Sequence, residues 1–243
     1  MMIREEVKKS IKSIRDVILT VSKNPLLYFS ECGLQAILVN RLLECSELSN
    51  PIETGIYDRY KHKIDKLSND MEYLDNALSV PPLQREYGSG NGGRTDIVIL
   101  NPEDIESIDN FQFQSDEEYL SPLIAIEIGT EKSDSKYYCK HLEKDVEDIN
   151  DLDADFKYIL DIIRNKNKCK KGTDTYKNKE ETLKPFKESF TDLSKKYEDI
   201  FFIGMIHHIA YQEVEFFSSE KDWKKYEPLS NEFERVVSKR LNL

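Results

Sequence analysis

Apolar residues recur every three or four positions over residues 3–21, a spacing that places them on one face of an amphipathic helix. A second helix is predicted from Ser30, a residue suited to cap a helix, to about Leu48, because Asn50 and Pro51 then interrupt the chain. Residues 56–78 also have helical spacing but are mostly polar, and we interpret them as an inserted segment. The first third of the chain is therefore predicted to be helical.

The spacing of the apolar residues changes after residue 80 and becomes typical of strands. Residues 83–87 are strand-like, residues 94–100 alternate in polarity, and the glycine-rich turn 89–93 joins them into a predicted hairpin. The aliphatic run 123–129 is typical of a strand that is buried on both faces. Two further strands are predicted at 157–163 and 200–209.

Helical and hydrophilic segments separate these strands. Helices are predicted at 134–150, in a polar segment ending near Tyr197, and near the C-terminus, with Pro185 as a break or a start of the polar helix. Residues 101–121 are predicted to form an acidic loop, and residues 165–178 a basic loop.

This succession of elements predicts an α/β protein with a mixed central sheet flanked by helices on both faces. One domain is expected over residues 1–243. Its core lies at about 26–163, with a helical insertion at about 52–79 and a C-terminal α/β completion at 176–243.

Composition excludes several classes of protein. The chain has 13 Tyr and 11 Phe among its 243 residues, more aromatic residues than disordered chains carry. No apolar run approaches the roughly 18 residues of a membrane span, and the N-terminus lacks the apolar core of a signal peptide. We therefore expect a cytoplasmic protein without a membrane partner. The four cysteines show no CxxC spacing, which argues against a zinc site.

Charge is distributed unevenly around a formal net charge of −11. Residues 103–118 contain seven acids and no base, whereas residues 164–187 contain nine bases against three acids. An acidic chain can still bind nucleic acid through a local basic patch. Either these runs are solvated faces and loops, or the basic residues bind DNA phosphates. The candidates for such DNA binding are Arg94, Lys166, Lys168, Lys170 and Lys171.

Three acids lie where the pattern predicts apolar surroundings. Glu31 falls on the apolar stripe of the second predicted helix, Asp96 lies inside the strand 94–100, and Glu127 lies in the middle of the aliphatic strand 123–129. A buried carboxylate is costly unless a salt bridge or a metal ion compensates it. Each acid alone is explained by a sheet end or an ion pair. Together they indicate a site for a hard cation, Mg²⁺ or Mn²⁺, which prefers carboxylate oxygens.

The segments that carry these acids resemble the motifs of the PD-(D/E)xK nuclease superfamily, which has the restriction-endonuclease-like fold. These segments are Ser30–Gln35, Gln84–Tyr87, Arg94–Ile99, Ile126–Gly129 and, in the next helix, Lys140–Val146. The resemblance covers about residues 26–163. It implies that Asp96 and Glu127 bind Mg²⁺ or Mn²⁺, that Glu31 completes the metal site, and that the protein is a metal-dependent endonuclease acting on DNA. Many members cut both DNA strands as dimers, so the resemblance also implies that this chain could form a homodimer.

One position departs from the family pattern. The family has a lysine two residues after the second acid, on the same strand face, where it positions or polarises the attacking water. This chain has Gly129 at that position. Either another base replaces the lysine, or the site is weak or inactive. The candidate replacements are Lys132, Lys140, Lys144 and Arg94.

Four further residues are weaker candidates. Glu86 is either another ligand or a surface acid, and Asp161 is expected near a sheet end. His207 and His208 are adjacent in a strand and point to opposite faces, so they cannot chelate one ion there. We expect one histidine in the core and the other exposed.

Three functional hypotheses follow. The first is a metal-dependent nuclease that hydrolyses DNA phosphodiester bonds. The alternative is a catalytically decayed nuclease-fold module that binds nucleic acid or a protein partner without cleavage. The third is an acidic interaction protein with buried ion pairs and no affinity for nucleic acid.

Overall fold

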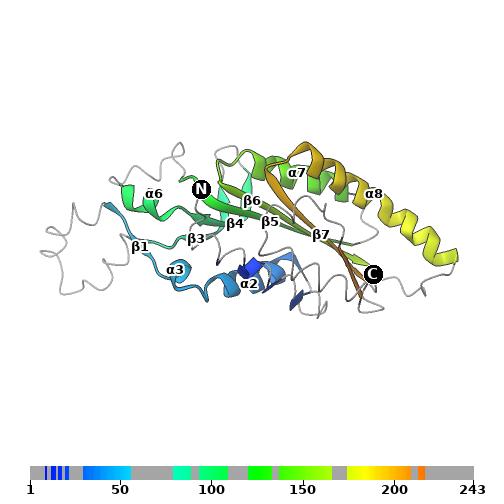
Figure 1. Cartoon of the computed structure of the whole chain (residues 1–243), viewed down its shortest axis with the longest axis horizontal. Helices are drawn as coiled ribbons and strands as arrows, with labels where there is room; N and C mark the ends of the chain where they lie inside the picture. The colour runs from blue at the N-terminus through cyan, green and yellow to red at the C-terminus, as the bar shows by residue number, and fades with distance from the viewer. Residues whose placement is uncertain are drawn as a thin grey trace, which may run out of the picture.

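The computed structural model describes residues 9, 12–14, 16–17, 20–21, 30–55, 79–88, 93–108, 120–132, 137–165, 174–208 and 213–216. Over these residues the chain forms a six-stranded mixed sheet with helices on both faces (Figure 1). This confirms the predicted α/β class. The predicted helix over 56–78, the basic stretch Lys166–Lys171 and the predicted C-terminal helix lie outside the described residues.

The sheet changes from antiparallel to parallel pairing at its centre. The first three strands pair antiparallel, the third, fourth and fifth pair parallel, and the sixth is antiparallel to the fifth. Their order across the sheet follows the chain. The strands are β3 Leu83–Gly88, β4 Arg94–Leu100, β5 Pro122–Lys132, β6 Phe156–Asn165, β7 Ile200–His208 and β8 Glu213–Phe216.

Two layers of helices cover the sheet (Figure 1). Helices α2 Glu31–Leu42 and α3 Ser46–Ser49 lie on one face. Helices α7 Tyr138–Asn150 and α8 Asp174–Lys196 lie on the other face, where α7 connects β5 to β6 and α8 connects β6 to β7. A small two-stranded sheet of β1 Ile52–Glu53 and β2 Ser79–Val80 takes up the ends of the segment predicted as a helical insertion.

Helix α2 begins where the sequence predicts, because the Ser30 hydroxyl accepts a hydrogen bond from the Gly33 amide at 3.2 Å and caps the first turn. Its apolar stripe of Leu34, Leu38 and Leu42 is fully buried in one core cluster of the molecule. The helix ends at Leu42 rather than near residue 48, and α3 follows as a separate turn.

Helix α7 buries the opposite face of the sheet. Tyr138, Leu142, Val146 and Ile149 recur at helical spacing and are all buried. They belong to the second core cluster, which also contains Val98 and other residues whose side chains alternate with those of the first cluster along the strands. The sheet is therefore covered by two separate apolar cores.

Several predicted elements differ from the structure. The predicted acidic loop contains α6 Pro102–Ser107, which starts because the Asn101 side chain accepts a hydrogen bond from the Glu103 amide and Pro102 suits the first helical turn. Pro185 lies inside α8 and neither breaks nor starts it. Both His207 and His208 are buried, so the expectation that one is exposed is wrong. None of the described helices is long and apolar enough to cross a membrane.

Candidate functional site

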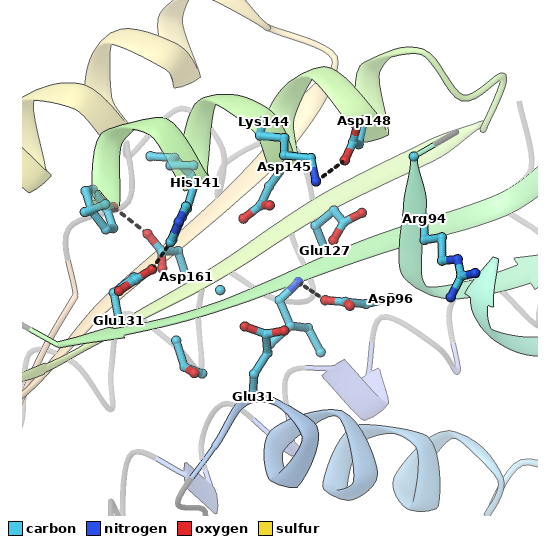
Figure 2. Close-up of a pocket in the computed structure, with 16 residues that line it drawn as sticks. Glu31, Arg94, Asp96, Glu127, Glu131, His141, Lys144, Asp145, Asp148 and Asp161 are labelled. Atoms are coloured by element: carbon cyan, nitrogen blue, oxygen red, sulfur yellow. Dashed lines mark hydrogen bonds and ion pairs between the residues drawn. The ribbon is translucent and has the colours of Figure 1, made fainter. Parts of the chain in front are cut away.

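A cavity of about 350 Å³ lies between the sheet and α7, with the start of α2 at its edge (Figure 2). It is lined mainly by polar residues from β4, β5, β6 and α7. Arg94, Lys144 and His141 are its basic residues. Seven of its residues are acids: Glu31, Asp96, Glu127, Glu131, Asp145, Asp148 and Asp161. All three acids that the sequence singled out therefore line one cavity.

Asp96 is held between α2 and β5. It is 9% exposed, and its Oδ1 accepts a hydrogen bond from the Gln35 side chain at 2.6 Å. Its Oδ2 accepts one from the Ile128 amide at 2.7 Å. The Gln35 carbonyl in turn accepts a hydrogen bond from Arg85 at 3.1 Å. Burial, opposed by the Ile128 hydrogen bond, raises the pKa of Asp96 to about 6.

Glu127 is buried in the middle of β5. It is 5% exposed, and its Oε1 has no hydrogen-bond partner within the described part of the chain. Burial, and then the negative charges of Asp96, Asp145 and Asp148, raise the pKa of Glu127 to about 10. Without a cation, this carboxyl group is expected to be protonated at neutral pH.

Asp145 and Asp161 extend the acidic surface toward α7 and β6. Burial, followed by the charge of Asp96, raises the pKa of Asp145 to about 7. Burial also raises the pKa of Asp161 to about 7, although the Tyr138 hydroxyl donates a hydrogen bond to it and opposes the shift. Asp161 lies in the middle of β6 and is 2% exposed, so its predicted place at a sheet end is wrong.

Glu31 lies at the mouth of the cavity, and its side chain points toward the other acids (Figure 2). It is exposed, so the predicted burial on the apolar stripe is wrong. As the first residue of α2, it precedes the turns that pack on the sheet. Partial burial and the charges of Glu131 and Glu86 still raise the pKa of Glu31.

Gly129 lies beside two of these acids. A Cβ atom at this position would lie 2.8 Å from Asp161 Oδ1 and 3.8 Å from Asp145 Oδ2. The family's lysine position is therefore bounded by carboxylate oxygens. A side chain there requires Asp161 to move.

The candidate replacements for the lysine differ in their placement. Lys144 lines the cavity, 3.9 Å from Asp148, with its side chain 73% exposed. Arg94 also lines the cavity (Figure 2). Lys140 is exposed and is not among the lining residues, and the side chain of Lys132 lies outside the described part of the structure. The same holds for Lys166, Lys168, Lys170 and Lys171.

Sequence reasoning missed two groups of lining residues. Glu131, whose carboxylate is hydrogen-bonded to His141 Nδ1, follows Glu127 and Gly129 at the strand period of two. The α7 residues His141, Asp145 and Asp148 are spaced by four and three, which places them on one helix face. Both spacings are legible in the sequence once the strand and the helix are known to be neighbours.

Glu86 is exposed, as a surface strand acid would be, and it is not among the lining residues. Its φ of 51° lies in the left-handed region that residues other than glycine rarely occupy. Its charge contributes to the raised pKa of Asp96 and of Glu31. Glu86 therefore acts on the cavity electrostatically from outside.

Among the described residues, no group of three or more His, Cys, Asp or Glu side chains is arranged, as it stands, to hold a metal ion. The acids share a cavity without forming a finished coordination shell. No protein-family model, curated protein or solved structure matches this chain. Any functional assignment therefore depends on the residues of the cavity themselves.

Proposed function

We propose that this protein is a divalent-cation-dependent nuclease that hydrolyses DNA phosphodiester bonds on a restriction-endonuclease-like fold. The observation that carries the proposal is Glu127, a carboxylic acid in the middle of a buried strand with an oxygen that lacks a partner among the described residues. The segments on which the family resemblance rests lie in α2, β3, β4, β5 and α7, and acids from α2, β4 and β5 line the same cavity.

A cation explains this cavity better than buried ion pairs do. Within the described part of the chain, neither Asp96 nor Glu127 forms an ion pair with a base. Their charged forms are disfavoured by burial and by each other. A divalent ion reverses that electrostatic balance, because it is the largest local charge in such a site.

The residues fit Mg²⁺ or Mn²⁺, which take carboxylate oxygens and keep several waters. Asp96 and Glu127 would hold the ion from neighbouring strands, and Glu31 would approach it from the cavity mouth, directly or through water. The orientation of Asp96 is already fixed by Gln35 and the Ile128 amide. When bound, such an ion lowers the pKa of water and stabilises charge that develops on a phosphodiester.

Basic residues would orient the water and the DNA. Lys144 lines the cavity and is therefore the best placed of the described lysines, with Lys132 and Lys140 as the other candidates. Arg94 lines the cavity beside Asp96 and would contact a phosphate. The basic stretch Lys166–Lys171 directly follows β6, whose residue Arg164 is in register with Lys132 of β5. We propose that this stretch holds the DNA backbone.

Substitution of Asp96 tests the proposal. Asp96→Asn keeps the size of the side chain, and Asp96→Ala removes the carboxylate entirely. Both are expected to reduce Mg²⁺-dependent cleavage of plasmid and oligonucleotide DNA to background, while circular dichroism shows a folded protein. Glu143→Gln, on an exposed position of α7, is the control and should cleave like wild type. Full activity of the Asp96 variants would refute the assignment.

Gly129 favours a second candidate, a nuclease-fold module that binds nucleic acid or a protein partner without cleavage. Position 129, where the family has its lysine, is bounded by Asp145 and Asp161. Lys144, the lysine that lines the cavity among the described residues, lies 3.9 Å from Asp148. This candidate predicts DNA binding that is insensitive to Mg²⁺ and no cleavage by the wild-type protein. Gel shifts with and without Mg²⁺, run beside the cleavage assay, distinguish the two candidates.

A further inference from the structure

An exposed aromatic side chain lies one helical turn before the cavity residues of α7. Within the described part of the chain, Leu43 and Tyr137 are the large apolar side chains that remain exposed, at 42% and 51%. Tyr137 immediately precedes α7 and has a helical backbone conformation. Because residues four apart lie on the same helix face, Tyr137 continues the face from which His141 and Asp145 line the cavity.

Tyr137 and His141 form a stacked pair of rings. Their centroids are 6.3 Å apart and their planes differ by 21°, an offset-stacked arrangement. His141 is in turn hydrogen-bonded through Nδ1 to Glu131 of β5, so one member of the pair is tied to the sheet (Figure 2). Although His141 packs against it, Tyr137 keeps half of its surface exposed. The pair therefore presents an aromatic surface to solvent beside the cavity.

An aromatic surface in this position suits an unpaired base better than a duplex. Every base has a π-face that stacks on an aromatic ring, whereas in a duplex neighbouring base pairs cover these faces. Stacking also requires no positive charge on the protein, and the adjoining cavity is lined by seven acids. An uncharged base approaches this surface without the repulsion that the acids exert on phosphates, and a single strand brings one phosphate backbone to the acids where a duplex brings two.

We propose that the stacked pair of Tyr137 and His141 binds an unpaired base of single-stranded DNA beside the acidic cavity. This inference rests on the proposed function and names the substrate class of the same site, a single strand or a single-stranded overhang rather than a blunt duplex. The base stacks on the exposed ring of Tyr137, which brings the adjoining phosphate to the mouth of the cavity.

Binding of a single strand and of a blunt duplex of equal length tests this inference without cleavage. Fluorescence anisotropy is measured in Ca²⁺, and denaturing gels verify that the labelled DNA stays intact. Wild type is expected to bind the single strand more tightly than the duplex. Tyr137→Ala should weaken single-strand binding by roughly 5- to 150-fold, the range for loss of one base–aromatic stack, and should change duplex binding by less than about twofold.

Two variants serve as controls. Tyr137→Phe keeps the ring and should bind both kinds of DNA like wild type. Leu43→Ala removes the other large exposed apolar side chain, which follows α2 on the opposite face of the sheet, and should change neither affinity. Because Tyr137 is half exposed, Tyr137→Ala is expected to fold, which thermal unfolding verifies.

Equal affinity of wild type for single strand and duplex, no binding of either, or equal losses of both in Tyr137→Ala would overturn the inference. A loss in Tyr137→Phe as large as that in Tyr137→Ala would also overturn it, because the ring is then not what binds the base. If wild type cleaves DNA in Mg²⁺ while Tyr137→Ala binds single strands like wild type, the base-binding surface fails and the proposed nuclease stands. If single-strand binding depends on the Tyr137 ring but wild type does not cleave DNA, the nuclease proposal fails instead.

Discussion

At the scale of single residues, the position of the Asp161 carboxylate requires a residue without a side chain at position 129. Asp161 is in register with Gly129 on one side and with Gly204 on the other, so neither neighbouring strand places a side chain against its carboxylate. The carboxylate is buried and hydrogen-bonded to Tyr138, and it lies 2.8 Å from where a Cβ of residue 129 would be. A Cβ contact that short does not occur without displacement of one partner.

Gly129→Ala is therefore expected to destabilise the protein by about 1–3 kcal/mol, the usual cost when an added methyl group forces a neighbouring side chain, here Asp161, out of its position. Urea unfolding followed by circular dichroism measures this change. Gly33→Ala, in the helix α2, is the matched control and should be neutral or stabilising by up to about 1 kcal/mol, because glycine is unfavourable in helices.

The effect of Gly129→Ala should depend on Asp161. In an Asp161→Ala background the clash is absent, so the added methyl group should cost much less than in wild type. A double-mutant cycle expresses this coupling as a free energy. Equal costs in the two backgrounds would show that Asp161 is not the reason for the glycine.

The sequence predicted the buried acids Asp96 and Glu127, because a charged residue inside an apolar strand is visible as a break in the pattern. It did not predict Asp145 or the central burial of Asp161. Asp145 lies on a helix with many other acids, and nothing local distinguishes the one that faces the sheet. That distinction depends on which helix covers which strand.

At the scale of elements, Gln35 connects α2 to the strands that carry the site. It is 1% exposed, donates a hydrogen bond to Asp96 of β4 and accepts one from Arg85 of β3. Helix α2 and both strands are thus joined through one amide group. We infer that Gln35 is a positioning residue that fixes the rotamer of Asp96.

Replacing Gln35 with Met keeps the volume of the side chain and removes both hydrogen bonds. It is expected to lower the free energy of unfolding by about 1–3 kcal/mol, because the buried Asp96 Oδ1 loses its donor. Urea unfolding measures the loss, and Asn40→Ala, at an exposed position of α2, serves as the control. If Gln35 only fills space, Gln35→Met will unfold at the same urea concentration as wild type.

The elements that were not predicted from the sequence are either stabilised by tertiary packing against their local preference or too short to show a periodicity. Pro185 lies within α8 although an internal proline costs about 3 kcal/mol. The buried residues Leu183, Phe186 and Phe190 of that helix supply packing that offsets this cost. Helix α6 is signalled by its cap Asn101 and by Pro102, but with 6 residues it is too short for a helical periodicity to stand out. The edge strand β8 has four residues, too few for a periodicity to stand out.

At the scale of the whole molecule, charge opposes the proposed substrate. The chain carries a net charge of −11. Seven acids line the cavity, whereas its lining contains one arginine, Arg94, and one lysine, Lys144. The class of fold was predictable, because continuous aliphatic strands between helices require a covered sheet. The sequence predicted that Glu31, Asp96 and Glu127 share a site, but not that Glu131, Asp145, Asp148 and Asp161 line the same cavity, because that depends on the pairing and covering of strands distant in sequence.

This opposition leads to a prediction about DNA binding itself. With its acids uncompensated, the cavity should repel phosphates, so DNA should bind weakly in EDTA and more tightly when divalent cations neutralise the carboxylates. Fluorescence anisotropy of a labelled duplex with the wild-type protein measures this in EDTA and in Ca²⁺, an ion that also takes carboxylate oxygens. Glu127→Gln, which loses a proposed ligand, should gain less affinity from Ca²⁺, and the charge-matched control Glu143→Gln should behave like wild type.

The basic stretch should account for much of the salt dependence of that binding. Replacing Lys166, Lys168, Lys170 and Lys171 with Gln should weaken binding uniformly across DNA sequences. The slope of log affinity against log salt should become shallower by about 0.9 for each phosphate that the variant no longer neutralises. An unchanged slope would place the DNA-binding surface elsewhere on the chain. No binding at low salt, with or without divalent cations, would instead support an acidic interaction protein, because only that hypothesis requires no affinity for nucleic acid.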